Sequence, residues 1–135
     1  MGTVLDAYAL IALLEDERAA DEVERLIASR DSAISTVNLA EAAQRLLRHS
    51  TVTSEELRYL VASLPLVIVP YTEVHAWRAA ELRARHYRRR GSVLSLADCC
   101  FVAVATPVDR VATADRAVLR MAAAEGIATV ELPSA

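Results

Sequence analysis

The chain has 135 residues, of which 54% are hydrophobic and 4% aromatic, and its formal net charge is -3. This length fits one compact domain over residues 1–135, and the low aromatic content argues against an all-β sandwich. The mild net charge excludes a basic surface over the whole molecule, so any nucleic-acid contact must use a local patch. All 15 cationic residues are arginine, which excludes mechanisms that need a catalytic or phosphate-binding lysine.

Cysteine usage and the apolar segments bear on the compartment. Cys99 and Cys100 are neighbours in an apolar segment, where a mutual disulfide would be strained, so we expect buried free thiols. No charged segment precedes an apolar one as in a secretion signal, and the longest apolar stretches are shorter than a membrane span. We therefore expect a cytoplasmic protein with no membrane contact.

The first half of the chain begins with a short apolar run that ends at Asp6. Strands are predicted at residues 3–5 and 32–35, and helices at residues 7–15, 19–29, 36–49 and 53–64. Thr36 offers its hydroxyl as the N-cap of the third helix, and Thr53 and Glu56 have capping-box spacing at the start of the fourth. Asn38 lies with Glu41 on the predicted polar stripe of the third helix.

The second half continues the alternation of strands and helices. Strands are predicted at residues 66–69, 110–113 and 128–132, and helices at residues 72–90, 95–106 and 114–124. Gly91, Pro107 and Gly126 end these helices, and we expect residues 133–135 to fray. The strands are too far apart for hairpins, which predicts right-handed crossovers and an α/β fold with a parallel sheet of four or five strands.

Each of four carboxylates has an ordinary structural explanation when it is considered alone. Asp6 and Asp115 follow predicted strands and could cap the next helix. Asp98 could complete a capping box with Ser95, and Glu41 could lie on a solvated helix face. No single acid therefore identifies a site.

Their joint placement points to a shared site. Asp6 and Asp115 end strands of one parallel sheet, and Glu41 and Asp98 stand in early helical turns around it, so all four can converge at the C-terminal edge. Four carboxylates in one cleft repel one another unless cations offset their charge. Oxygen-only ligands favour Mg²⁺ or Mn²⁺, and such a site suits phosphodiester hydrolysis, because the cation polarises the phosphate and acidifies a water molecule.

Four motifs, in this order and spacing, resemble those of the PIN domain and of the toxins of VapBC-type toxin-antitoxin pairs. They are Val4–Leu10, Val37–Glu41, Ser95–Asp98 and Thr113–Arg116. The resemblance covers nearly the whole chain and implies a three-layer PIN-like fold, in which four or five short parallel strands are flanked by about seven helices. It also implies an RNA endonuclease that uses Mg²⁺ or Mn²⁺, with Asp6, Glu41, Asp98 and Asp115 as catalytic and metal-binding residues and Thr113 as a supporting hydroxyl.

The same resemblance implies partners. A toxin of this kind cleaves cellular RNA, inhibits growth or translation and is neutralised by a cognate VapB-like antitoxin. We also expect a homodimer, because the helix at residues 7–15 is apolar nearly all round and predicts a subunit or antitoxin contact. Core packing between two layers is the alternative for this helix. A stand-alone PIN nuclease in RNA processing and a non-catalytic interaction module are alternatives for the whole chain.

Arginines at the end of the 72–90 helix form a local basic patch. They could neutralise RNA phosphates, although cations at a helix C-terminus also interact favourably with the helix dipole. Arg45, one turn beyond Glu41, is a further candidate. The predicted RNA contacts are Arg45, Arg85, Arg88 and Arg89.

Two other α/β classes lack the residues that they require. Receiver and haloacid-dehalogenase-like domains also place acids at strand ends, but they need a lysine, and the latter expect an aspartate where this chain has Tyr8. A dinucleotide-binding domain needs a glycine-rich turn, which the isolated glycines of this chain cannot form.

Overall fold

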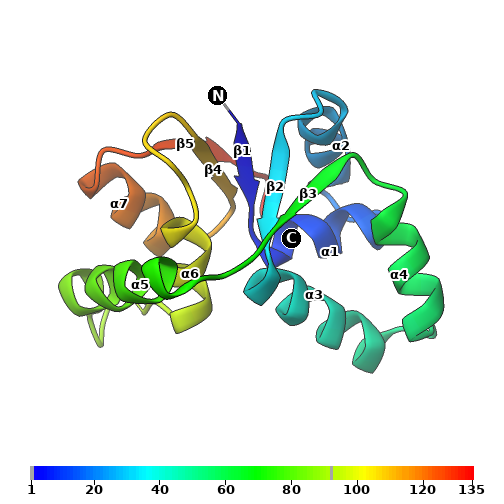
Figure 1. Cartoon of the computed structure of the whole chain (residues 1–135), viewed down its shortest axis with the longest axis horizontal. Coiled ribbons are helices and arrows are strands. Elements are labelled where there is room, and N and C mark those ends of the chain that lie inside the picture. The colour runs from blue at the N-terminus through cyan, green and yellow to red at the C-terminus, as the bar shows by residue number, and fades with distance from the viewer. Residues whose placement is uncertain (1, 92) are drawn as a thin grey trace.

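The computed structural model describes residues 2–91 and 93–135. It has a central sheet of five parallel strands, which helices cover on both faces (Figure 1). The strands are β1 (Thr3–Leu5), β2 (Ser32–Ser35), β3 (Leu66–Val69), β4 (Arg110–Thr113) and β5 (Ala128–Glu131). The helices are α1 (Ala7–Leu14), α2 (Ala20–Ala28), α3 (Thr36–His49), α4 (Ser54–Ala62), α5 (Glu73–His86), α6 (Leu96–Ala103) and α7 (Arg116–Ala124). The predicted α/β fold, with four or five parallel strands and about seven helices, is confirmed, and the described residues form five strands and seven helices.

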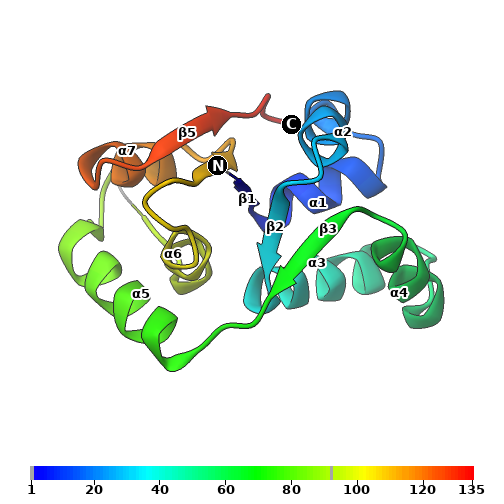
Figure 2. The ribbon, with the colours of Figure 1, turned by 45° about the horizontal axis from the view of Figure 1, so that its top comes forward.

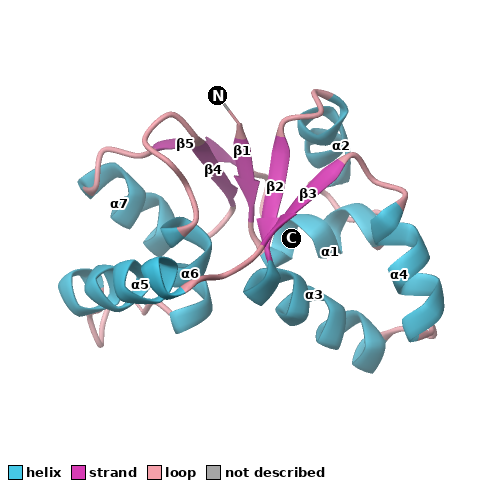
Figure 3. Ribbon diagram, viewed as in Figure 1, coloured by secondary structure: helices cyan, strands magenta, loops and turns pink. Residues whose placement is uncertain are grey.

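The strand order creates a crevice at one edge of the sheet. The order is β3-β2-β1-β4-β5, so the chain builds outward from β1 in one direction and then returns to continue from β4 in the other (Figure 3). Leu5 of β1 pairs with Ala112 of β4 at the centre. In open α/β sheets, ligands bind beyond the carboxyl ends of the strands at such a reversal. The residues that follow β1 and β4 therefore occupy the position where a site is expected.

Two layers of helices bury the two faces of the sheet. Helices α5, α6 and α7 pack against the face that carries Val4 and Val111, with Phe101 fully buried among them. Helices α1 and α2 pack against Leu5 on the opposite face, and α3 and α4 cover Ile34 beside them (Figure 2). Consecutive side chains of a strand point to opposite faces, so the apolar runs of the central strands serve both layers. The apolar surface of α1 packs against this core, which is the core-packing alternative for that helix.

The N-terminus of α3 differs from the sequence-based expectation. Ser35, not Thr36, is the N-cap, and its Oγ accepts a hydrogen bond from the Asn38 N–H at 3.1 Å. The Thr36 hydroxyl instead accepts a bond from the Tyr71 N–H at 3.1 Å. Asn38 lies in the first turn of the helix and is only 1% exposed. Asn38 shares a helix face with Glu41, as predicted, but at Asn38 this polar face is buried against α6.

Helix α5 ends four residues earlier than the sequence indicated. The helix stops at His86, and Tyr87 takes an extended conformation while its ring lies 4.4 Å from the Arg83 guanidinium carbon. Arg83 Nε also donates to the Leu94 carbonyl at 3.0 Å, and Leu94 is buried. Burying Leu94 requires the chain to turn back here, so the consecutive arginines that follow Tyr87 lie outside the helix.

Cys99 and Cys100 are buried free thiols, as the sequence predicted. Cys100 donates a hydrogen bond to the Tyr71 hydroxyl at 3.0 Å, which joins α6 to the loop before α5. Over residues 2–91 and 93–135, no helix combines the length and the apolar character that crossing a membrane demands.

Candidate active site

The four predicted carboxylates line one cleft at the C-terminal edge of the sheet. Asp6 directly follows β1, and Asp115 follows β4 across the point where the strand order reverses. Glu41 stands in the second turn of α3 and Asp98 in the first turn of α6. All four side chains border a cleft of about 300 Å³. The folded chain thus brings together residues that are widely separated in the sequence.

The three aspartates of the cleft also accept hydrogen bonds at the starts of helices. Each uses one carboxylate oxygen to accept a backbone N–H at the start of a helix, which leaves the second oxygen for other partners. The bonds run from Ala9 to Asp6 Oδ1 (2.9 Å), from Ser95 to Asp98 Oδ2 (2.9 Å) and from Ala117 to Asp115 Oδ1 (2.8 Å). The structural explanation for each acid is therefore correct, and it does not compete with a shared site.

Thr113 connects the two central loops. Its buried hydroxyl donates to Asp6 Oδ2 at 2.7 Å and accepts a bond from the Asp115 N–H at 3.1 Å. The residue was predicted to supply a supporting hydroxyl near the metal, and in the structure that hydroxyl holds the Asp6 carboxylate. Thr113 thereby fixes Asp6 relative to the loop that carries Asp115.

The carboxylates also perturb one another electrostatically. Burial raises the pKa of Asp6 to about 6, against the opposing effect of its bonds from Thr113 and Ala9. The charges of Asp98 and Glu41 raise this pKa further. Burial likewise raises the pKa of Asp98, and the charge of Asp115 adds to the rise. A cation in the cleft would relieve this repulsion.

The arrangement is an open cleft and not a closed cage. Within the described residues, no three His, Cys, Asp or Glu side chains are close enough together to hold one metal ion. Mg²⁺ usually keeps several waters and binds through one or two carboxylates, so carboxylate oxygens spread around a solvated cleft fit this ion. An all-oxygen donor set likewise suits Mn²⁺ better than Zn²⁺.

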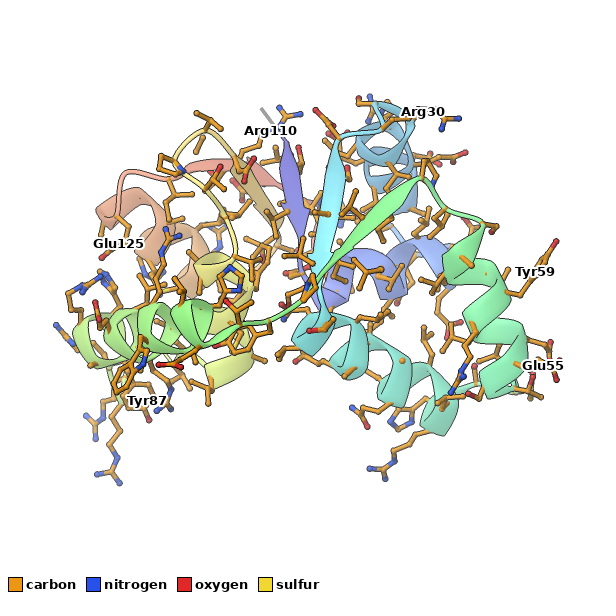
Figure 4. All side chains as sticks on the ribbon, in the orientation of Figure 1. Arg30, Glu55, Tyr59, Tyr87, Arg110 and Glu125 are labelled. Atoms are coloured by element: carbon orange, nitrogen blue, oxygen red, sulfur yellow. The ribbon has the colours of Figure 1, made fainter. Side chains whose placement is uncertain are left out.

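The predicted RNA-contacting arginines separate into two groups. Arg45 lines the cleft with the acids, as expected from its place one turn after Glu41. Arg85 instead pairs with Glu125 of the α7 C-cap at 3.0 Å, and neither Arg88 nor Arg89 lines the cleft. Figure 4 places Glu125 and Tyr87 on the α5 and α7 side of the molecule, away from the ends of β1 and β2. The structure does not bring this basic patch to the acids.

Asn38 also lines the cleft, although the sequence did not mark it as a site residue. Its Nδ2 donates to the Ala97 carbonyl at 3.1 Å and lies 3.4 Å from Glu41 Oε1. The Ser35 hydroxyl donates to Asn38 Oδ1 at 2.6 Å. Asn38 therefore ties α3 to α6 and orients Glu41 within the cleft. The available sequence signal was the spacing of three residues between Asn38 and Glu41, which places them on one helix face.

Replacing Asn38 with alanine should affect both stability and the site. The variant leaves the Ala97 carbonyl without its partner, which costs about 1–3 kcal/mol of unfolding free energy. It also frees Glu41, and loss of a residue that orients a metal ligand typically lowers activity about 10- to 100-fold. Urea unfolding and initial nuclease rates measure the two effects. Gln44→Ala, an exposed amide on the same helix, is the matched control, and equal behaviour of the two variants would contradict the role of Asn38.

The segment at residues 133–135 also belongs to the site. The Tyr8 hydroxyl donates to the Pro133 carbonyl at 2.6 Å, and Ser134 and Ala135 line the acidic cleft. The segment has no helix or strand after Glu131, and the Tyr8 bond connects its first residue to α1. No local sequence pattern indicates a contact between the first helix and the last residues.

Comparisons with known proteins agree with this geometry. Residues 3–128 match the family model of the PIN domain. No curated protein matches the chain. The chain is similar to VapBC2 from Rickettsia felis bound to a promoter DNA fragment, at 17% identity and TM-score 0.72 over 98% of this chain and 100% of that chain.

Two further solved structures have the same fold. DNA-bound VapBC from Salmonella typhimurium is 19% identical at TM-score 0.71, over 97% of this chain and 98% of that one. A toxin-antitoxin complex from Klebsiella pneumoniae is 20% identical at TM-score 0.63, over 84% and 87%. At these identities the likeness establishes the fold alone.

Proposed function

Because the chain belongs to the PIN domain family, we propose that it is an endoribonuclease that hydrolyses RNA phosphodiester bonds with Mg²⁺ or Mn²⁺. PIN domains are typically hydrolytic nucleases that use divalent metal ions. The observation that carries the proposal is the single cleft lined by Asp6, Glu41, Asp98 and Asp115. The raised pKa of Asp6 supports it, because the neighbouring acids that contribute to this rise would together attract a cation.

Residues of the cleft have distinct roles in this reaction. One or two of the four carboxylates would bind the cation directly, and the others would reach it through water molecules. When bound, the cation supplies Lewis-acid polarisation of the scissile phosphate and a more acidic water. Thr113 holds the Asp6 carboxylate, and Asn38 orients Glu41, so two of the four acids are fixed before substrate arrives. Arg45 binds a phosphate oxygen at the rim of the cleft.

The biological setting that we propose is a toxin-antitoxin pair in the cytoplasm. In this setting the chain is the toxin, cleaves cellular RNA, forms a homodimer and is neutralised by a cognate VapB-like antitoxin. Support comes from solved structures of the same fold, which include VapBC assemblies and a toxin-antitoxin complex. The acidic cleft is the feature that an antitoxin would have to block.

Incubating the purified chain with total cellular RNA tests the activity. We expect discrete endonucleolytic fragments in Mg²⁺ or Mn²⁺, no cleavage in EDTA, and recovery when the metal is added back. The toxin assignment predicts that induced expression of the chain arrests growth. Cleavage that persists in EDTA, or no cleavage with either metal, would overturn the proposed chemistry.

A further inference from the structure

A second cleft adjoins the acidic one. It has a volume of about 610 Å³ and is lined by Arg18, Arg116, Glu131 and the segment that ends at Ser134. Ala114 and Ser134 border both clefts, so the two spaces meet at these residues. The second cleft therefore continues the surface on which the acids lie.

The charge of the surface changes sign between the two clefts. The acidic cleft has four carboxylates and one arginine, whereas the second cleft has two arginines and one carboxylate, Glu131. Arg18 and Arg116 are exposed, and within residues 2–91 and 93–135 neither forms a salt bridge or a side-chain hydrogen bond. Arg85 in the α5 patch differs, because Glu125 already neutralises its charge. The guanidinium groups of the second cleft are thus free to bind an anion.

Tyr8 holds the boundary between the two clefts in place. Its ring lines the acidic cleft, and its hydroxyl anchors the Pro133 carbonyl, which borders the second cleft. Burial chiefly raises the pKa of Tyr8, the charges of Glu17 and Asp6 raise it further, and the charge of Arg18 lowers it. One side chain therefore lies within electrostatic reach of a site acid and of an arginine of the second cleft.

We propose that the cleft containing Arg18 and Arg116 binds an RNA phosphate that flanks the scissile phosphate. This subsite rests on the proposed nuclease function, and it would bind the part of the RNA strand that extends beyond the acidic cleft. The strand would leave the acidic cleft over Ser134 and place its next phosphates between the two guanidinium groups. Arginine binds phosphate oxygens through paired N–H groups, and such contacts offset the repulsion between RNA and four carboxylates.

Salt-dependent RNA binding tests this subsite. The probe is a fluorescein-labelled 20-nucleotide single-stranded RNA of mixed sequence, bound in Ca²⁺ in place of Mg²⁺, with its integrity checked on a gel. The variants are Arg18→Ala, Arg116→Ala and Glu131→Gln. Arg58→Ala is the matched control, because Arg58 is exposed on α4 and lines neither cleft.

Affinity falls as the salt concentration rises, and each arginine variant should make the slope of log affinity against log salt shallower by about 0.7. This is the value for one lost phosphate contact on a single strand. This slope corresponds to about fivefold weaker binding at 0.1 M KCl. Glu131→Gln should strengthen binding, because it removes the one negative charge of the cleft. In cleavage assays the arginine variants should raise KM while kcat stays near the native value, since the contact is equal in ground and transition states.

Native slopes in both arginine variants, or an equal loss in Arg58→Ala, would overturn the subsite while native cleavage still supports the nuclease function. If the native chain neither binds nor cleaves RNA in the presence of metal, both proposals fail. The two failures are therefore distinguishable in one set of measurements.

Discussion

Asp6→Asn is expected to lower the rate of RNA cleavage by about 10²- to 10⁴-fold, the equivalent of about 3–5 kcal/mol of lost transition-state stabilisation. Asp6 directly follows β1, where the strand order reverses, and it is one of the carboxylates proposed to hold the cation. Asparagine has almost the same shape but carries no negative charge. The loss should therefore appear in kcat and in metal affinity, measured by initial rates over a Mn²⁺ titration.

The same substitution should leave the fold intact. Asparagine is as good an N-cap as aspartate, so its Oδ1 keeps the bond from the Ala9 N–H. Its Nδ2 can donate to the Thr113 hydroxyl, in place of the bond that this hydroxyl donates to Asp6 Oδ2. Because burial disfavours the charged form of Asp6, the neutral variant should unfold at a higher urea concentration than the native chain at pH 7.5 in EDTA. A variant that is both inactive and more stable cannot owe its inactivity to unfolding.

Asp21→Asn is the matched control for this experiment. Asp21 is exposed on α2 and borders neither the acidic nor the arginine cleft. We expect its cleavage rate to stay within about twofold of native, because exposed charges far from the site contribute little. Native activity in Asp6→Asn would contradict the metal role of the carboxylate, and equal losses in the two variants would contradict its specificity.

Stability of the metal-free protein should fall as the pH rises from about 4 to about 7. The pKa of Asp6 in the folded chain is about 6, above its ordinary value of 3.8, so the folded state binds more protons than the unfolded state in this window. The free energy of unfolding then decreases with pH, by up to about 3 kcal/mol for this one group. The raised pKa of Asp98 acts in the same direction.

Two other acids have lowered pKa values, and they affect stability in a different pH range. Bonds from His86 and Arg85 lower the pKa of Glu125, and bonds from Thr106 and Gly2 lower that of Asp109 against the opposing effect of burial. Their stabilisation is present above their ordinary pKa values and is lost only as the pH falls below about 4 to 4.5. Between pH 5 and 7 the effect of Asp6 should therefore dominate.

Urea unfolding from pH 4.5 to 8 measures this dependence. In EDTA the midpoint should drop with rising pH, and in Mn²⁺ the drop should disappear, because the cation binds the deprotonated carboxylates. Cleavage should correspondingly increase as the pH rises through about 6. Asp6→Asn should lose most of the pH dependence in EDTA. A native chain whose midpoint is constant over this range would contradict the electrostatic description of the cleft.

Local patterns in the sequence determined the elements of this protein and the positions of its acids. The apolar run Thr3–Leu5, followed by Asp6, indicates a buried strand with a carboxylate at its end, because periodicity and chain punctuation are properties of neighbouring residues. The capping box of Thr53 and Glu56 is likewise set by their spacing, and the structure contains both of its bonds. Once the sheet is parallel, the strand-end acids must share one edge.

Only the tertiary structure decided how these elements end and what surrounds the acids. Helix α5 stops at His86 because the chain turns back to bury Leu94, and Asn38 is buried because α6 packs against α3. The bond from Tyr8 to Pro133 spans 125 residues, and it forms where the first helix and the last segment meet at the same edge of the sheet. Such contacts depend on the packing of distant elements, and no local pattern encodes them.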